Sequence, residues 1–301
     1  MFRSLFILVW FAFLAGWLPA ADLPGRRRVM TWVPPYGVAE CRKRLEESFE
    51  GKGMKDGLTH LGLQFWSPTR EGGLKLVDRF GAIDEATVTW FVEWGKRHGV
   101  RVLLCVYNGS ANGWDWELAQ SAFDTNREKF VRNLLGETRR LKLDGVDLDL
   151  EGNGELDGSR PDFLRFVREL SAGLHGVSKE LTVDTFPAKW HAPNRLWWSD
   201  LFPHVDAVHA MGYDELGASA PDWRSYAFLK KAAGRHSSKL VIGMPGHLSE
   251  WQGERVQAHL DWVASDKEVG LAIWDARLTD PAWRSGNLWK TLEGIRTGER
   301  E

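Results

Sequence analysis

The chain has 301 residues, with 39 Lys and Arg against 41 Asp and Glu and a formal net charge of −2. This balance excludes the basic field that nucleic acid requires and gives no polybasic patch for a membrane surface. The 17 tryptophans suit a protein that stacks indole rings on flat sugar faces, although large aromatic residues also fill cores. Only two cysteines occur, and the apolar run around Cys105 favours a buried, unpaired thiol there rather than a disulfide with Cys41.

The first 21 residues differ from the rest of the chain. Residues 1–3 carry a positive charge, 4–18 are almost wholly apolar, and 19–21 are small residues and a proline. This is the layout of a cleaved secretory signal peptide, and the apolar stretch is short for a membrane span of about 20 residues. We therefore expect a signal peptide over 1–21 and a mature domain over 22–301. The domain is expected to be soluble, secreted or periplasmic, monomeric and without a membrane anchor.

Short apolar runs alternate with longer amphipathic stretches along the mature chain, and this alternation predicts a parallel sheet covered by helices. Eight such runs favour a closed (β/α)8 TIM barrel over an open sheet. The segment Trp32-Val33-Pro34-Pro35 after the first run lacks a dinucleotide-binding glycine pattern, and no linker divides the chain. The predicted strands are 28–32, 59–65, 101–107, 144–150, 181–186, 207–212, 239–244 and 271–274. The predicted helices include 85–98, 121–141, 161–175, 225–236 and 250–264.

The fourth predicted strand carries the informative residues. Asp147, Asp149 and Glu151 fall on one face of the strand, and the valine and leucines between them fall on the other. Asp149 and Glu151 lie about 7 Å apart along such a strand. In a barrel the acidic face points inward and Glu151 reaches the carboxyl-terminal mouth, where barrel enzymes carry out their chemistry.

Stacked carboxylates raise one another's pKa, so this strand is suited to hold a proton at neutral pH. Glu151 is therefore the predicted general acid. A calcium loop and a solvated acidic turn are the competing interpretations. The calcium template would need Glu at position 12, where Gly158 stands, and the apolar alternation opposes a turn. The histidines show no metal-binding spacing, so His60 and His209 are interpreted as packing residues and no metal or other cofactor is expected.

Residues 144–151 read DGVDLDLE and resemble the D-G-x-D-x-D-x-E signature of glycoside hydrolase family 18, which includes chitinases and endo-N-acetylglucosaminidases. The resemblance extends to Met211-Gly212-Tyr213-Asp214, which is similar to the family's M-x-Y-D motif. It also extends to Trp274, which is similar to the tryptophan beneath the family's cleaved sugar, and to segment 239–245.

The resemblance implies a retaining glycosidase in which the substrate's own 2-acetamido group is the nucleophile. Glu151 would protonate the glycosidic oxygen, Asp149 would orient the acetamido N–H, and Asp147 would share a proton beneath it. Tyr213 would bond the acetamido oxygen. Further sugar contacts are expected from Asp214, Trp274, Met211, Trp32, Trp66 and Tyr107. The implied substrate is a β-1,4-linked N-acetylglucosamine glycan, with chitin or chitooligosaccharides first and N-glycans or peptidoglycan as alternatives.

Two other classes remain open: a lectin-like sugar-binding protein on the same fold, and an envelope protein with a residual site. Lectin-like members of the family usually lack the terminal glutamate, and this chain has Glu151. The chain also departs from the family pattern. Tyr107 and Asn108 place bulk where the family often has bare backbone, and Leu150 stands where many bacterial members have Trp. The predicted seventh and eighth strands are too close for the family's insertion domain, so we expect a shallow cleft.

Overall fold

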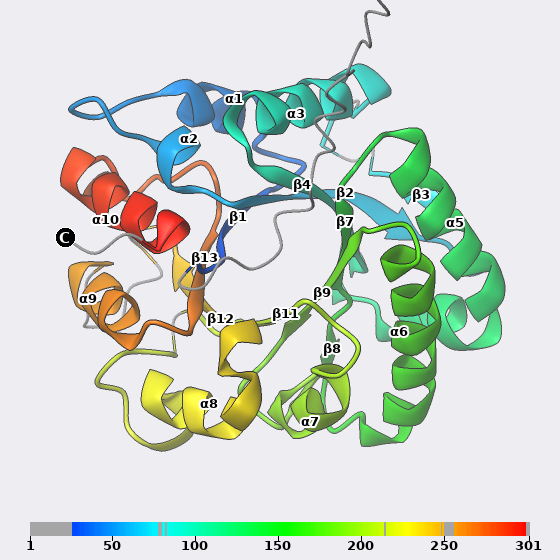
Figure 1. Ribbon diagram of the computed structural model, residues 1–301. Coiled ribbons are helices and arrows are strands. Elements are labelled where there is room, and N and C mark those ends of the chain that lie inside the picture. Colours follow the sequence, from blue (N-terminus) through cyan, green and yellow to red (C-terminus); the bar gives the residue numbers. More distant parts are fainter. Residues whose placement is uncertain are drawn as a thin grey trace, which may run out of the picture.

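The computed structural model describes residues 26–77, 80–81, 83–213, 215–247, 249 and 256–298, so the predicted signal peptide and Asp214 lie outside the described residues. Eight parallel strands run in the order β1-β2-β4-β7-β9-β11-β12-β13, and β13 pairs with β1 to close the barrel (Figure 1). The fold is the predicted (β/α)8 barrel. Its strands are β1 (Val29–Val33), β2 (His60–Pro68), β4 (Arg101–Tyr107), β7 (Gly145–Asp149), β9 (Glu180–Thr185), β11 (Ala207–Ala210), β12 (Leu240–Pro245) and β13 (Gly270–Trp274).

Helices surround the barrel on the outside (Figure 1). They are α1 (Val38–Glu46), α2 (Met54–Gly57), α3 (Glu85–His98), α4 (Trp116–Gln120), α5 (Arg127–Arg140), α6 (Arg160–His175), α7 (Trp198–Leu201), α8 (Tyr226–Ala233), α9 (Val256–Asp266) and α10 (Gly286–Thr297). Helix α3 matches its prediction because its ends are marked in the sequence. The Asp84 side chain accepts from the Thr87 amide at its start, and Gly99 takes a left-handed conformation at its end. None of the described helices is long and apolar enough to cross a membrane.

The sequence prediction was wrong at two element boundaries. The strand predicted over 59–65 continues as β2 to Pro68, because its end pairs antiparallel with β3 (Leu74–Leu76) beyond the barrel wall. The helix predicted over 121–141 is divided into a π-helical turn over Ser121–Thr125 and the α-helix α5. Two short antiparallel strand pairs follow the barrel strands. They are β5 (Gly109–Ser110) with β6 (Gly113–Trp114), and β8 (Gly152–Asn153) with β10 (His191–Ala192).

The core has two layers, and the apolar side chains of β7 belong to the outer one. Val146, Leu148 and Leu150 join the large apolar layer between the strands and the helices. The barrel interior holds a much smaller apolar set that includes Trp32 and Cys105. Cys41 and Cys105 are both buried and free. Because burial of apolar surface stabilises the outer layer, the interior can hold the polar groups that form the site.

An ion-pair cluster closes the opposite, amino-terminal end of the barrel. The carboxylate of Glu180, at the start of β9, accepts hydrogen bonds from Arg28 at 2.9 Å and from Arg101. The Nε2 atom of His60 lies 3.0 Å from the same carboxylate. The interpretation of His60 as a packing residue was therefore incomplete, because its ring belongs to this polar cluster. Charged groups at the amino-terminal end of a barrel serve stability rather than catalysis.

Replacing Glu180 with Ala is expected to lower the free energy of unfolding by about 2 kcal/mol, because it leaves two arginines half-buried without their counterion. Urea unfolding followed by circular dichroism measures this change. The matched control is Glu169→Ala, which removes a single pair with Arg127 from a side chain that is 39% exposed, against 15% for Glu180. Equal losses of stability in the two variants would contradict the role given to the cluster.

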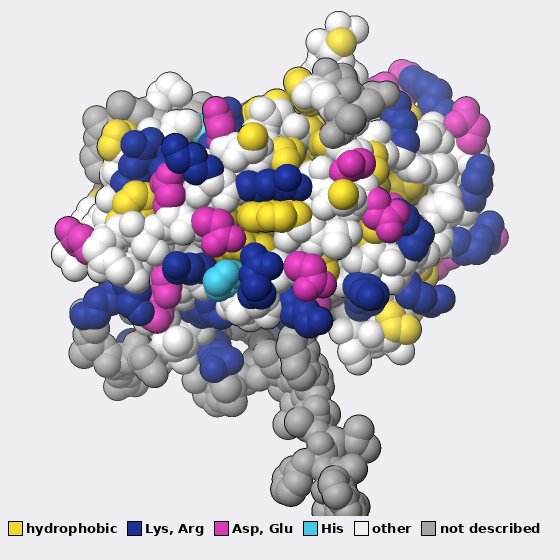
Figure 2. Space-filling view, turned by 90° about the horizontal axis from the view of Figure 1, so that it is seen from above, with side chains coloured by type: hydrophobic (Ala, Val, Ile, Leu, Met, Phe, Trp, Pro, Cys, Tyr) yellow, Lys and Arg dark blue, Asp and Glu magenta, His cyan; other side chains and the backbone are white. Residues whose placement is uncertain are grey.

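The surface is mixed in charge. Lys, Arg, Asp and Glu side chains alternate over the face that carries α1 and α3 (Figure 2). Ion pairs across this face include Arg97 with Glu46 at 3.5 Å and Arg140 with Glu85. This face therefore offers no broad field of a single sign for a charged polymer.

Candidate active site

Two acidic side chains of β7 and one that lies two residues past its end point into the barrel and rise toward its mouth. Asp147, Asp149 and Glu151 are 0%, 3% and 6% exposed, and the apolar residues between them face the helices. Strand β7 lies between β4 and β9, with Cys105 and Thr182 in register with Asp147 and Tyr107 in register with Asp149. The alternation in the sequence thus places all three carboxylates on the interior face of β7, as expected.

Asp147 is fixed at the base of this row. The Trp32 indole Nε1 donates to its Oδ2 at 2.7 Å, and the Thr182 hydroxyl donates to its Oδ1. These bonds favour the ionised carboxylate, but complete burial outweighs them and raises the pKa of Asp147. Trp32 is itself fully buried, so the structure places it beneath the acids, where it positions Asp147, rather than on a sugar-binding surface.

Asp149 and Glu151 form the upper pair. Gln64 from β2 donates to Asp149 Oδ2 at 2.6 Å. Burial raises the pKa of Asp149 to about 6, and hydrogen bonds from Glu151 and Gln64 oppose this rise. Burial also raises the pKa of Glu151 well above its ordinary value, and the negative charge of Asp149 raises it further. At neutral pH the proton of this pair therefore resides on Glu151 while Asp149 is negative.

Asn108 holds the backbone of Glu151 in place. The Glu151 amide donates to Asn108 Oδ1 at 2.8 Å, and Asn108 Nδ2 donates to the Glu151 carbonyl at 2.8 Å. Asn108 is fully buried, so the bulk noted at this position in the sequence lies inside the protein. Tyr107 is also buried, with its ring 6.2 Å from that of Trp114 in an edge-to-face contact. Of these two residues it is Asn108 that clamps the backbone of the acid.

A histidine–aspartate pair lies beside the acidic row. His209 Nδ1 is 2.6 Å from Asp184 Oδ1 and 3.5 Å from Asp147 Oδ1. Burial lowers the pKa of His209 well below its ordinary value, and burial together with the neighbouring carboxylates raises that of Asp184. The two groups therefore share one proton and add no net charge below the acids. The interpretation of His209 as a packing residue was incomplete, because the ring is buried against Trp32 but also pairs with Asp184.

Sequence reasoning overlooked Gln64, Asn108 and Asp184. A signal was available for Asp184, because it alternates with Leu181 and Val183 on β9 just as the acids alternate with leucines on β7. Gln64 and Asn108 carry no comparable signal. Their role depends on the neighbours that the closed barrel brings together, which are β2 and β4 beside β7.

Aromatic side chains surround the mouth on the other side of the barrel. The rings of Tyr213, after β11, and Trp274, at the end of β13, stack at 6.3 Å with 18° between their planes. Gly243 leaves the space for this arrangement, because a Cβ there would lie 2.6 Å from Tyr213 Cε1. Met211 is buried beside them. Trp274 also lies 6.0 Å from Trp32, which connects the aromatic wall to the acidic row.

Trp66 does not belong to this group. It is 1% exposed, joins the outer apolar layer, and its Nε1 donates to Glu137 of α5 at 3.3 Å. Because its side chain points from β2 toward the helices, we leave it out of the sugar-binding surface. Its position near a strand end in the sequence did not reveal which way the ring faces.

Two pairs of aromatic rings stand further out at the mouth. Tyr36 and Phe80 meet edge to face at 5.4 Å after β1 and β3, and both are exposed. Trp190 and Trp223 meet edge to face at 5.2 Å after β9 and β11. The first pair follows barrel strands one and two and the second follows strands five and six, so they lie on opposite sides of the eight-stranded mouth.

The buried acids could in principle hold a cation. Ligand atoms of Asp147, Asp184 and His209 lie within 4.8 Å of one another, as do those of Cys105, Asp149 and Asp184. The first group already uses these atoms in hydrogen bonds: both Asp147 oxygens accept protons, and His209 Nδ1 meets Asp184. These atoms of the first group therefore have hydrogen-bond partners, whereas Asp149 Oδ1 of the second group and the other ring nitrogen of His209, Nε2, have none among the described residues.

Comparison with known proteins agrees with this geometry. The family model described as "Glycosyl hydrolases family 18" matches residues 44–289. An endochitinase from Manduca sexta is 28% identical over 183 residues, which cover 52% of this chain and 33% of that protein. A chitinase from Chromobacterium violaceum superposes with a TM-score of 0.65 at 14% identity, covering 91% of this chain and 100% of the other. The spore cortex-lytic enzyme SleL of Bacillus megaterium gives a TM-score of 0.65 at 12% identity, covering 89% and 75%.

Proposed function

The chain belongs to glycoside hydrolase family 18, and from this premise we propose that it hydrolyses β-1,4-linked N-acetylglucosamine glycans by retaining, substrate-assisted catalysis. The observation that carries the proposal is the buried row of Asp147, Asp149 and Glu151 at the mouth of the barrel, where burial and the charge of Asp149 raise the pKa of Glu151. The names of similar proteins, an endochitinase and several chitinases, support chitin-type glycans as the first candidates. The predicted signal peptide supports action outside the cytosol.

In the first step, Glu151 transfers its proton to the glycosidic oxygen as the bond from that oxygen to the anomeric carbon breaks. The carbonyl oxygen of the substrate's 2-acetamido group bonds to the anomeric carbon from the opposite face. Asp149 accepts a hydrogen bond from the acetamido N–H and stabilises the positive charge that develops there. Asp147 is held by Trp32 and Thr182, and it keeps Asp149 in place from below.

In the second step, the ionised Glu151 removes a proton from water, and the water oxygen replaces the acetamido oxygen at the anomeric carbon. Two inversions give net retention of configuration. Tyr213 donates to the acetamido oxygen in this mechanism, and Trp274 supplies a flat apolar face under the sugar ring; the stacking of the two rings supports these roles. The aromatic pairs Tyr36–Phe80 and Trp190–Trp223 suit a glycan that extends across the mouth on both sides of the cleaved bond.

The proposal predicts that hydrolysis requires the N-acetyl group. Chitotetraose is expected to be cut at least about 100-fold faster than its fully de-N-acetylated counterpart or cellotetraose, because only the first carries the internal nucleophile. Product release followed by chromatography measures the rates. Peptidoglycan and high-mannose glycopeptides tested in parallel identify the preferred polymer. Binding of chitotetraose without any cleavage would instead favour a sugar-binding protein on this fold.

A further inference from the structure

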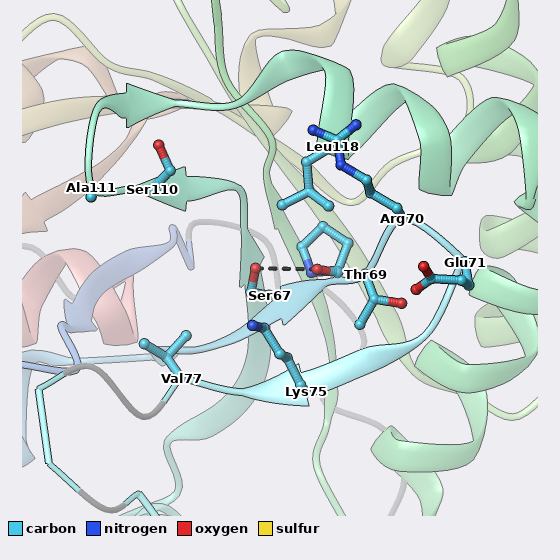
Figure 3. Close-up of a pocket in the computed structure, with 11 residues that line it drawn as sticks. Ser67, Thr69, Arg70, Glu71, Lys75, Val77, Ser110, Ala111 and Leu118 are labelled. Carbon is cyan, nitrogen blue, oxygen red and sulfur yellow. Dashed lines mark hydrogen bonds between the residues drawn. The ribbon is translucent and has the colours of Figure 1, made fainter.

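A pocket of about 480 Å³ opens beside the acidic strand, between the β2–β3 hairpin and the loop after β4 (Figure 3). It is lined by Ser67–Glu71, Lys75, Val77, Gly109–Ala111 and Leu118. Strands β2 and β4 precede β7 in the barrel order, and their carboxyl ends lie at the same mouth as Glu151. Gly109 directly follows Asn108, the residue that clamps the Glu151 backbone. The pocket is therefore adjacent to the proposed catalytic centre but separate from it.

The charged residues of this pocket are not equivalent. Arg70 reaches away toward Leu118 and pairs with Asp115 at 3.6 Å. The Glu71 carboxylate turns toward Thr69 (Figure 3). A hydrogen bond from the Glu71 backbone lowers the pKa of Glu71 most, and the hydrogen bond from the Thr69 hydroxyl lowers it further. Lys75 points its ammonium group toward Ser67 (Figure 3). Lys75 forms no ion pair with any residue that the structure describes.

The pocket therefore presents one ammonium group that has no counterion among the residues the structure describes. The hydroxyls of Ser67 and Ser110 add hydrogen-bonding capacity, and Pro68, Val77 and Leu118 supply apolar walls. A carboxylate attached to a short aliphatic group matches this combination, and the volume lies in the range of small-ligand sites. Unsubstituted N-acetylglucosamine is neutral and gives the ammonium group nothing to pair with.

We propose that this pocket binds a carboxylate-bearing substituent of the glycan, such as the 3-O-lactyl ether of an N-acetylhexosamine or the peptide attached to it. The inference rests on the proposed function and narrows it, because it extends the substrates from neutral chitin-type chains to acid-substituted ones of the peptidoglycan type. Lys75 pairs with the carboxylate while the sugar backbone crosses the mouth beside Glu151.

The test compares two tetrasaccharides of equal length, one of N-acetylglucosamine alone and one alternating with its 3-O-lactyl derivative. Lys75→Gln is expected to lower kcat/KM for the acidic glycan about tenfold and to leave that for the neutral glycan unchanged. Lys75→Arg, which keeps the charge, should retain most of the activity on the acidic glycan. Raising the salt concentration should weaken the wild-type preference and leave the Lys75→Gln variant unaffected.

Equal loss on both glycans, or no loss on either, would overturn the proposal while leaving the hydrolase function intact. Binding of both glycans to Glu151→Gln protein, measured by calorimetry, gives an answer that does not depend on cleavage. If Glu151→Gln protein binds the acidic glycan more tightly than the neutral one, and the double variant with Lys75→Gln does not, the proposed role of the pocket is supported even if neither glycan is cut. Equal affinities for the two glycans in Glu151→Gln protein refute it.

Discussion

Glu151→Gln is expected to reduce kcat on chitooligosaccharides by on the order of 10³-fold, because glutamine keeps the size of the side chain but has no proton to donate. The backbone bonds between residue 151 and Asn108 do not involve the carboxyl group, so they should persist in the variant. KM should change little, since the aromatic walls and Asp149 remain. Steady-state hydrolysis of chitotetraose measures the loss, and thermal unfolding verifies that the variant is folded.

The matched control is Glu155→Gln, four residues further along the chain. Glu155 is largely exposed, and its one ion-pair partner among the described residues is Lys189, at 3.7 Å. Its replacement should leave kcat within about twofold of the wild type, because an exposed pair contributes little. If Glu151→Gln retained more than a tenth of the wild-type kcat, Glu151 could not be the acid. Similar losses in the two variants would point to disturbance of the loop instead.

Asp149→Asn is the second change with a large expected effect, about 10²-fold in kcat. Asparagine still fills the space beside Gln64, but it removes the negative charge that stabilises the acetamido group during bond cleavage. Asp147→Asn, one step lower on the strand, should cost less because Asp147 acts through Asp149. The order of the two losses, measured on the same substrate, therefore tests the roles given to the two residues.

The dependence of activity on pH distinguishes the loss of the Asp149 charge in Asp149→Asn from a general disturbance of the structure. Wild-type activity should fall below about pH 6, where Asp149 takes up a proton, and fall again at high pH, where Glu151 loses its own. The charge of Asp149 raises the pKa of Glu151, so removing it lowers that pKa and moves the alkaline limb to lower pH. The limb near pH 6 should disappear in the same variant. An unchanged profile in Asp149→Asn would contradict this electrostatic coupling.

The barrel and the acidic row could be predicted from sequence because both follow from local periodicity. Near-continuous apolar strands alternating with helices define a covered parallel sheet, and the two-residue alternation at Asp147, Asp149 and Glu151 fixes which face they share. The roles of Tyr213 and Trp274 came instead from the family motifs. Their stacking on each other is a structural finding that no spacing predicted.

The remaining residues could not be predicted because their contacts are made across the barrel. His209 lies on an apolar strand, where a satisfied core histidine is the common case, and only its neighbour Asp184 reveals its polar role. Trp66 and Trp32 both stand in strands, yet one ring faces Glu137 outside the wall and the other faces Asp147 inside. The direction in which a side chain points depends on the register of its strand. The register of β2 shifts at a β-bulge between Leu63 and Trp66, and the sequence does not reveal this shift.

The central claim is that the substrate's acetamido group, with Glu151 as acid, performs the hydrolysis. The most direct measurement is the ratio of initial rates on chitotetraose and on its fully de-N-acetylated counterpart at equal concentration. The account predicts a ratio of at least about 100 in favour of chitotetraose. Comparable rates on the two substrates would show that the nucleophile is not the acetamido group and would contradict it.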